Sequence, residues 1–137
     1  MNLNPLFSSV SVHWATPSDL YSELDSEFHF NFDPCPLYGS KGLEVDWRGR
    51  RVYCNPPYGR GVAAWLEKRI GTSVCVYLLP ARTDTRWWHD HAMMATEIRF
   101  LRGRLKFGNH KNSAPFPSVV LVYLTSSNLD GMRGDGG

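Results

Sequence analysis

The sequence predicts a single α/β domain whose mainly parallel sheet ends in an antiparallel hairpin. Short β-rich apolar segments alternate with segments of helical periodicity, the order typical of strand–helix–strand units. A length of 137 residues suffices for one core, and 42% hydrophobic residues with 13% aromatics exclude general disorder. We expect one domain over residues 1–124 and a flexible, glycine-rich tail over residues 125–137.

The first expected element is a helix from Pro17 to about Ser26. Thr16 is its predicted N-cap, Pro17 fills the first helical position, and the Asp19 carboxylate can reach back to the cap. Apolar residues then recur at helical spacing, at Leu20, Tyr21, Leu24 and Phe28.

Two short strands are expected next, over residues 29–33 and 52–54. The first ends at Asp33, and a carboxylate at the carboxyl end of a strand lies where open α/β sheets bind ligands. A turn at residues 47–50 precedes the second strand. The chain between the strands is too short for two further helix–strand units, so the sheet should be abbreviated here.

The remaining chain is predicted to contain helices and strands in alternation. Residues 73–79 form a continuous apolar run, which is typical of a fully buried strand. The other expected elements are helices over residues 62–70 and 86–95, strands over residues 97–101 and 118–124, and a hairpin arm over residues 104–107.

The candidate catalytic motif is Asn55-Pro56-Pro57-Tyr58, which directly follows the strand over residues 52–54. Proline has no backbone N–H and a fixed φ, so the sheet ladder should stop here. The Asn55 amide oxygen and the Pro56 carbonyl can accept both hydrogens of an exocyclic amino group, while Tyr58 offers a ring for stacking. Such a pair of acceptors would make a ring amine more nucleophilic.

Charge is distributed unevenly along the chain. Residues 1–50 contain seven acidic and three basic residues, whereas residues 51–137 contain six acidic and twelve basic ones. A basic second half fits a phosphate-rich partner, and it also fits a solvated basic face. The candidate DNA-binding residues are Arg82, Arg86, Arg102, Arg104, Lys106 and Lys111, with Arg99 in the same stretch. For Arg82 and Arg86 a helix-capping network around Thr83 or Asp84 remains an equal alternative.

Several function classes are disfavoured. The three cysteines are odd in number and lack CxxC spacing, which argues against disulfides and a zinc ribbon. His89 and His91 lie two residues apart on an expected helix and would not face the same metal ion, so we expect no metal. The first twelve residues do not resemble a signal peptide, and no apolar run approaches the ~20 residues that span a bilayer, so we expect a cytoplasmic protein without a membrane partner.

Taken together, residues 13–124 resemble the phage-type DNA N6-adenine methyltransferase family. The matching segments are Trp14-x-Thr16-Pro17, Asp33 after a strand, Gly42-Leu43 with Trp47, Asn55-Pro56-Pro57-Tyr58-Gly59, Leu79-Pro80-Ala81-Arg82-Thr83-Asp84-Thr85 with Trp87-Trp88-His89, Gly103-Arg104-Leu105 with Phe107, and Ser113-Ala114-Pro115-Phe116-Pro117-Ser118.

The resemblance implies an abbreviated class I methyltransferase fold, which is Rossmann-like, with S-adenosyl-L-methionine as cofactor and adenine in DNA as acceptor, in a bacterial host cell that carries a phage or prophage. By analogy, residues 55–58 would hold the flipped base and Asp33 the amino-acid or ribose part of the donor. Lys41 stands where an acidic residue is expected, which leaves Glu44 or Asp46 for the ribose. The donor pocket would be lined by Trp14, Thr16 and Pro17.

Other functions fit the same residues. A methyltransferase of RNA adenine or of a glutamine side chain would need the same acceptors, because each substrate presents a planar amino group. A non-catalytic DNA-binding module derived from such an enzyme is the alternative from a different class. The oligomeric state stays open.

Overall fold

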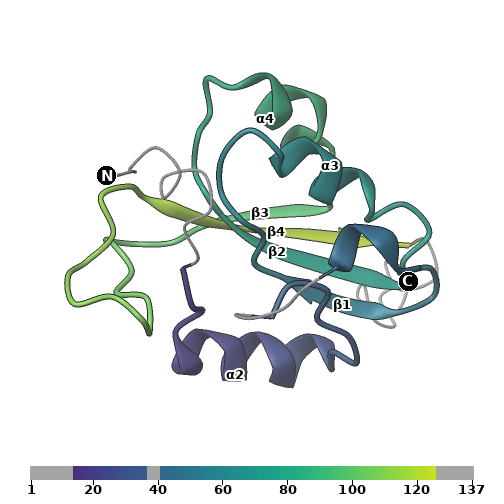
Figure 1. Ribbon diagram of the computed structural model, residues 1–137, viewed down its shortest axis with the longest axis horizontal. Helices are drawn as coiled ribbons and strands as arrows, with labels where there is room; N and C mark the ends of the chain where they lie inside the picture. Colours follow the sequence, from purple (N-terminus) through teal and green to yellow (C-terminus); the bar gives the residue numbers. More distant parts are fainter. Residues whose placement is uncertain (1–13, 37–40, 126–137) are drawn as a thin grey trace, which may run out of the picture.

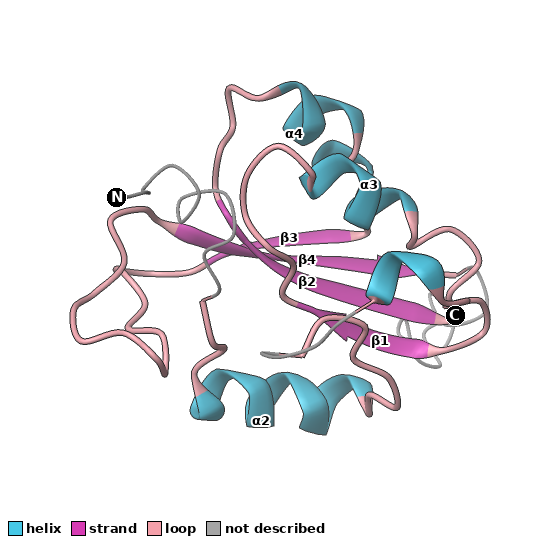
Figure 2. Cartoon of the chain, viewed as in Figure 1, coloured by secondary structure: helices cyan, strands magenta, loops and turns pink. Residues whose placement is uncertain are grey.

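A four-stranded mixed sheet organises the molecule, in the spatial order β1-β2-β4-β3 (Figure 2). The computed structural model describes residues 14–36 and 41–125. The strands are β1 (Arg51–Cys54), β2 (Val74–Pro80), β3 (Glu97–Phe100) and β4 (Ser118–Leu124).

Three of the four strands run in the same direction. β1 pairs with β2 in parallel, whereas β4 lies between β2 and β3 and is antiparallel to both. The sequence prediction of an α/β fold with an antiparallel C-terminal pair is therefore confirmed. Parallel pairing between neighbouring strands is limited to the β1 end of the sheet, because β4 inserts between β2 and β3.

Helices lie on both sides of the sheet (Figure 1). On one side is α2 (Ser18–Phe28), and on the other are α3 (Val62–Glu67) and α4 (Arg86–Asp90). Side chains alternate between the two faces of a strand, so each face of the sheet contacts a different helix. On one face the ring of Tyr53 in β1 contacts that of Tyr21 in α2, and on the other the hydroxyl of Tyr77 in β2 donates to the Trp65 carbonyl in α3. Two short 3₁₀ turns, η1 (Gly42–Glu44) and η2 (Ala92–Met94), complete the described elements.

The core lies on both faces of β2, all seven residues of which are buried. The unbroken apolar run over residues 73–79 predicted a fully buried strand, and the structure confirms it. β2 is buried on both faces because a helix layer lies on each side of the sheet. Leu24 and Phe28 of α2 are also buried, as the helical spacing predicts. The four-residue β1 and the seven-residue β4 flank β2.

Three sequence expectations are wrong in detail. The strand over residues 29–33 is only a single parallel bridge from Phe32 to Val52, because α2 extends to Phe28 and His29 ends it with a left-handed φ of 55°. The helix from Val62 ends at Glu67, so Ile70 is 71% exposed. Residues 104–107 are irregular and form no strand.

The predicted tail beyond Thr125 and the segment before Trp14 lie outside the described residues. Within the described ranges, no helix combines the length and the apolar character required to cross a membrane.

Candidate active site

The candidate site lies at the edge of the sheet where β1 and β2 end and β4 begins. β1 ends at Cys54 and β2 at Pro80, and Pro80 lies opposite Ser118 at the start of β4. The loops over residues 55–61, 81–85 and 101–117 therefore begin or end at one edge, and the segment over residues 14–17 reaches the same place through contacts with Asn55. This gathering follows from strand direction, because the carboxyl ends of β1 and β2 lie at the same edge of the sheet.

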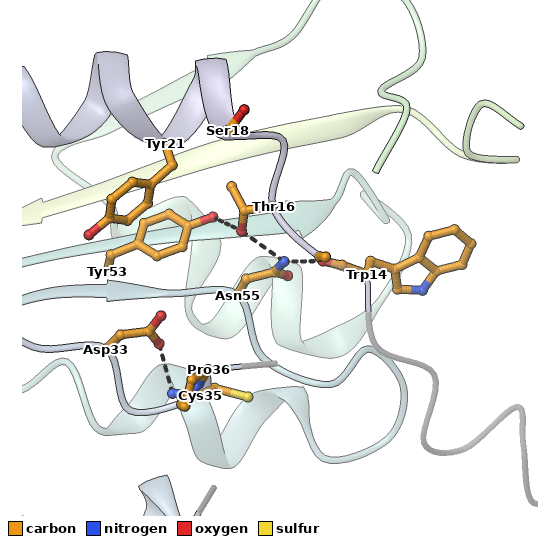
Figure 3. Close-up of a pocket in the computed structure, with 10 residues that line it drawn as sticks. Trp14, Thr16, Ser18, Tyr21, Asp33, Cys35, Pro36, Tyr53 and Asn55 are labelled. Carbon is orange, nitrogen blue, oxygen red and sulfur yellow. Dashed lines mark hydrogen bonds between the residues drawn. The ribbon is translucent and has the colours of Figure 1, made fainter. Parts of the chain in front are cut away.

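The side-chain amide of Asn55 is held by its nitrogen. Nδ2 donates hydrogen bonds to the Trp14 carbonyl and to Oγ1 of Thr16, the latter over 3.1 Å (Figure 3). The opposite orientation would place the amide oxygen against the Trp14 carbonyl, and two acceptors repel. Oδ1 is buried and has no hydrogen-bond partner among the described residues. The site thus presents one oriented acceptor that the fold leaves unused.

Thr16 is part of this network and not a helix cap. Its Oγ1 lies 2.6 Å from the hydroxyl of Tyr53, and burial raises the pKa of that phenol. The N-cap position of α2 is instead Pro17, and no side chain caps this helix. The predicted capping role of Thr16 is wrong, because its hydroxyl is already committed to Tyr53 and Asn55.

A first pocket, of about 300 Å³, lies beside Asn55. Asp33 and Thr16 contribute a carboxylate and a hydroxyl to it, and Cys35 donates its backbone N–H to Oδ1 of Asp33 over 2.9 Å. Asp33 as a whole residue is exposed at the rim, yet desolvation of its carboxyl by the surrounding protein raises its pKa, an effect that the Cys35 N–H opposes. The lining residues are Trp14, Ala15, Thr16, Ser18, Tyr21, Asp33, Cys35, Pro36, Tyr53 and Asn55 (Figure 3).

A second pocket, of about 570 Å³, shares Trp14 with the first and is mostly apolar. Tyr58 lines it but is anchored, since its hydroxyl donates to the Leu78 carbonyl over 3.2 Å and its ring meets Phe116 edge-on at 5.7 Å. Burial raises the pKa of Tyr58. The lining residues are Trp14, Tyr58, Gly59, Arg60, Val62, Pro80, Arg82, Thr85, Trp87, Pro115 and Phe116.

Several predicted site residues lie outside both pockets. Pro56 is buried and Pro57 half-buried, and neither lines a pocket. Pro17 borders a separate hollow beside Lys106. The two acidic residues proposed for the donor ribose, Glu44 and Asp46, are exposed and do not line the first pocket either.

Asp46 has a different partner in this structure. Its carboxylate binds Arg48 through two side-chain hydrogen bonds of 3.0 and 2.9 Å. The Arg48 guanidinium holds the pKa of Asp46 well below its usual range. The structure does not place Glu44 or Asp46 among the residues of the first pocket. A ribose contact by either residue therefore stays a prediction.

The predicted cations divide into two groups. Arg82 lines the second pocket with its guanidinium 5.7 Å from the Phe116 ring centroid, and Arg86, Arg102, Arg104, Lys106 and Lys111 are exposed. Arg99 is different, because its guanidinium binds both oxygens of Glu27 at 2.7 and 2.6 Å and Glu97 at 2.8 Å. Arg99 is thus engaged with two carboxylates in this structure, unlike the exposed cations of the same stretch.

Neither of the expected capping residues, Thr83 or Asp84, is the N-cap of α4. That position belongs to Thr85, whose Oγ1 accepts from the Trp88 N–H over 3.2 Å. Trp88 itself is buried in the core.

The cysteines do not serve the site chemically. All three, Cys35, Cys54 and Cys75, are buried and free. Burial raises the pKa of Cys54 well above its usual value and that of Cys75 to about 12. A thiolate nucleophile is therefore disfavoured next to the motif.

Sequence reasoning missed some pocket residues. Tyr53 is buried like its neighbours in β1 and contacts Tyr21 of α2, but no local pattern indicates its bond to Thr16. Arg60 and Phe116 both line the second pocket, and only the meeting of three loops brings them together.

A mixed α/β sheet with an oriented, unused amide acceptor beside two pockets is the arrangement of an enzyme site. A family model described as DNA N-6-adenine-methyltransferase (Dam) matches residues 6–124. The chain belongs to this family, which confirms the family resemblance seen in the sequence, and the match supports DNA adenine methylation in general as its activity. No curated protein matches the chain significantly, and no solved structure does.

Proposed function

We propose that the protein transfers a methyl group from S-adenosyl-L-methionine to the N6 amino group of adenine in DNA, on an abbreviated class I methyltransferase fold. The family membership supports the reaction in general. Three strands in one direction with a reversed β4 between β2 and β3 support the fold. We expect the enzyme to act on DNA in the cytoplasm of a bacterial host.

The observation that carries this proposal is the unused Oδ1 of Asn55. A buried acceptor without a partner costs about 1–3 kcal/mol, so the site gains when an N–H donor enters. The N6 amino group of adenine is such a donor. Because Nδ2 donates to Trp14 and Thr16, these two hydrogen bonds disfavour a flip of the amide that would exchange its nitrogen and oxygen. In the proposal the Pro56 carbonyl accepts the second amino hydrogen.

The first pocket fits the donor. S-adenosyl-L-methionine supplies an electrophilic methyl group on a sulfonium when bound. A carboxylate at Asp33 would accept its ammonium or a ribose hydroxyl, and either contact would offset the desolvation that raises the pKa of Asp33. Thr16 and Ser18 add hydroxyls, while Trp14 and Tyr21 add aromatic surface.

The second pocket fits the flipped adenine. Its apolar lining around Tyr58 and Phe116 can receive a planar base, and stacking of about 1–3 kcal/mol would offset the few kcal/mol that extrusion from the duplex costs. Trp14 lines both pockets and Asn55 lines the first, so the two reactants would meet beside Trp14, next to Asn55. Holding two reactants in this way can remove about 7–11 kcal/mol of barrier.

No strong base is needed at the start of the reaction. The Asn55 oxygen orients the amine, and the amine proton leaves to water after the methyl group has been transferred. Arg82 and Arg86 would bind phosphates next to the flipped base, and the exposed cations of the loop over residues 101–117 would bind phosphates further away.

The test is methyl transfer by the purified chain to unmethylated duplex DNA, with N6-methyladenine measured by mass spectrometry and an equal RNA substrate in parallel. We expect DNA methylation by the wild type, loss of at least about 100-fold in Asn55→Ala, and normal activity in Asn112→Ala, an exposed asparagine. A wild type that methylates only RNA, or an Asn55→Ala variant with full turnover, would overturn the proposal.

A further inference from the structure

The loop over residues 101–117 contacts the segment over residues 14–16 through two hydrogen bonds to Ala15 and through three rings that pack on Trp14, those of Phe107, His110 and Phe116. The backbone N–H of Gly108 donates to the Ala15 carbonyl over 2.8 Å, and Oδ1 of Asn109 accepts from the Ala15 N–H over 2.8 Å. The ring of His110 stacks on Trp14 with centroids 4.0 Å apart and planes inclined by 16°. Both backbone hydrogen-bonding groups of Ala15 are thus taken by two consecutive loop residues.

The other side of the same segment holds Asn55. Trp14 contributes its carbonyl and Thr16 its hydroxyl to the Asn55 amide nitrogen, and Ala15 lies between them. The first pocket is lined by Trp14, Ala15 and Thr16 together. Any movement of Ala15 therefore moves both groups that orient the amide, and it also changes the wall of the donor pocket.

The loop also carries exposed cations. Lys106 and Lys111 flank Asn109 and His110 in the chain and are exposed, as are Arg102 and Arg104. In the proposed function these side chains meet DNA phosphates. Asn109 and His110, which contact Ala15 and Trp14, thus belong to the same loop as the expected DNA-binding cations.

We propose that Asn109 is a positioning residue for Asn55. This assignment rests on the proposed function. The Asn109 carboxamide holds Ala15 in place, so that the neighbouring Trp14 and Thr16 present their oxygens to the Asn55 amide. Asn109 lines neither the first nor the second pocket. It acts through the segment over residues 14–16.

The bond from Ala15 to Asn109 is exposed to solvent, which decides what its loss would do. Water can replace an exposed hydrogen bond, so the free energy of unfolding should change little. The position of Ala15 should change more, and a misplacement of 1 Å near reacting groups can cost about 100-fold in rate. A positioning role thus predicts an effect on turnover without an equal effect on stability.

The experiment compares Asn109→Ala, Asn109→Asp and Asn112→Ala with the wild type. Turnover and the KM for DNA are measured well below the unfolding temperature, and donor affinity is measured by calorimetry. We expect Asn109→Ala to lower kcat at least tenfold and to weaken donor binding several-fold, with a KM for DNA within twofold of the wild type. Asn109→Asp retains an acceptor oxygen and should recover most of the turnover, while Asn112→Ala should match the wild type.

Each other outcome contradicts the inference. An active Asn109→Ala variant with wild-type kcat would overturn the positioning role and leave the proposed function intact. A fall in kcat only in parallel with a fall in Tm, without recovery in Asn109→Asp, would make Asn109 a purely structural residue. A wild type without DNA methylation would overturn the proposed function, and this inference with it.

If Asn109→Ala does not fold, His110→Ala gives the second test. It removes the stack on Trp14 and leaves both hydrogen bonds to Ala15. We expect a smaller fall in kcat, of about threefold to tenfold. Unchanged turnover in a folded His110→Ala variant would argue against the link between this loop and Asn55.

Discussion

Thr16 and Asn55 are 39 positions apart in the chain, yet the Asn55 amide nitrogen donates to the Thr16 hydroxyl over 3.1 Å. The same hydroxyl lies 2.6 Å from that of Tyr53. One threonine oxygen thus joins the segment before α2 to both β1 and the motif that follows it. The consequence is an amide whose nitrogen is bound and whose oxygen is available.

The first prediction concerns this hydroxyl. Thr16→Val keeps the shape of the side chain but removes the oxygen, so the Asn55 amide loses one anchor and the buried Tyr53 hydroxyl loses its partner. We expect a loss of about 1–3 kcal/mol in the free energy of unfolding and at least tenfold in turnover. Denaturant unfolding and the methyl-transfer assay measure the two effects. Thr16→Ser retains the oxygen and is the control; equal damage in Ser and Val variants would point to packing instead.

Gly42 lies against Pro34, the residue that follows Asp33 of the first pocket. A Cβ at this position would lie 2.1 Å from the Pro34 carbonyl oxygen and 2.7 Å from Cζ3 of Trp65. We expect Gly42→Ala to destabilise the protein by about 1–3 kcal/mol through overpacking and to weaken donor binding, because Pro34 follows Asp33 directly. Thermal unfolding and calorimetry provide the measurements.

Gly61 offers a matched control for that substitution. A Cβ there would meet nothing within 4 Å, and its φ of −81° suits any residue. Gly61→Ala should therefore be close to neutral. Comparable destabilisation by both alanines would contradict the close approach at Gly42.

The third prediction is a pH dependence from Glu27. The hydrogen bonds from Arg99 hold the pKa of Glu27 below its ordinary value of 4.5. A carboxyl group with a lowered pKa stabilises the folded state above the ordinary value, and this contribution is lost as the pH falls through the folded pKa. Side chains that are 43% and 31% exposed are screened by water, so the contribution should stay below about 1 kcal/mol.

Urea unfolding of Glu27→Gln and of the wild type checks this. We expect the variant to be less stable near about pH 7 and the difference to shrink towards about pH 3. Glu23→Gln removes a carboxylate from the exposed part of the same helix without removing an Arg99 partner, and it serves as the control. If the stability difference between Glu27→Gln and the wild type grew as the pH fell, the predicted direction of the pKa shift of Glu27 would be wrong.

The fourth prediction concerns salt. If Lys106 and Lys111 bind phosphates, replacing both with alanine should weaken DNA binding and lower the slope of log K against log salt by about 1 for each lost contact. Fluorescence anisotropy at several salt concentrations measures the slope. Lys68→Ala removes a cation whose Nζ is bonded to the Val45 carbonyl, away from this edge, and should leave the slope unchanged. Identical slopes for all variants would remove the two loop lysines from the DNA surface.

Local chemistry in the sequence was enough for several features. The strand over residues 118–124 was predicted with the bounds that β4 has. Its apolar run is continuous, and the proline before it and the polar segment after it fix its two ends. The position of Asn55 at a strand end followed from two prolines, which cannot continue a ladder. Burial of Leu24 and Phe28 followed from helical spacing.

Contacts between distant parts of the chain required the tertiary structure. Thr16 has the local pattern of an N-cap, but Tyr53 and Asn55 compete for its hydroxyl; Arg99 has the pattern of a free cation, but α2 brings Glu27 to it. Periodicity and capping rules describe neighbours in sequence, and these partners are 37 to 72 positions away. The sequence by itself thus determined the family, the main elements and the motif. Which oxygen of that motif stays available was decided only when the segment before α2 packed against β1 and the loop over residues 101–117.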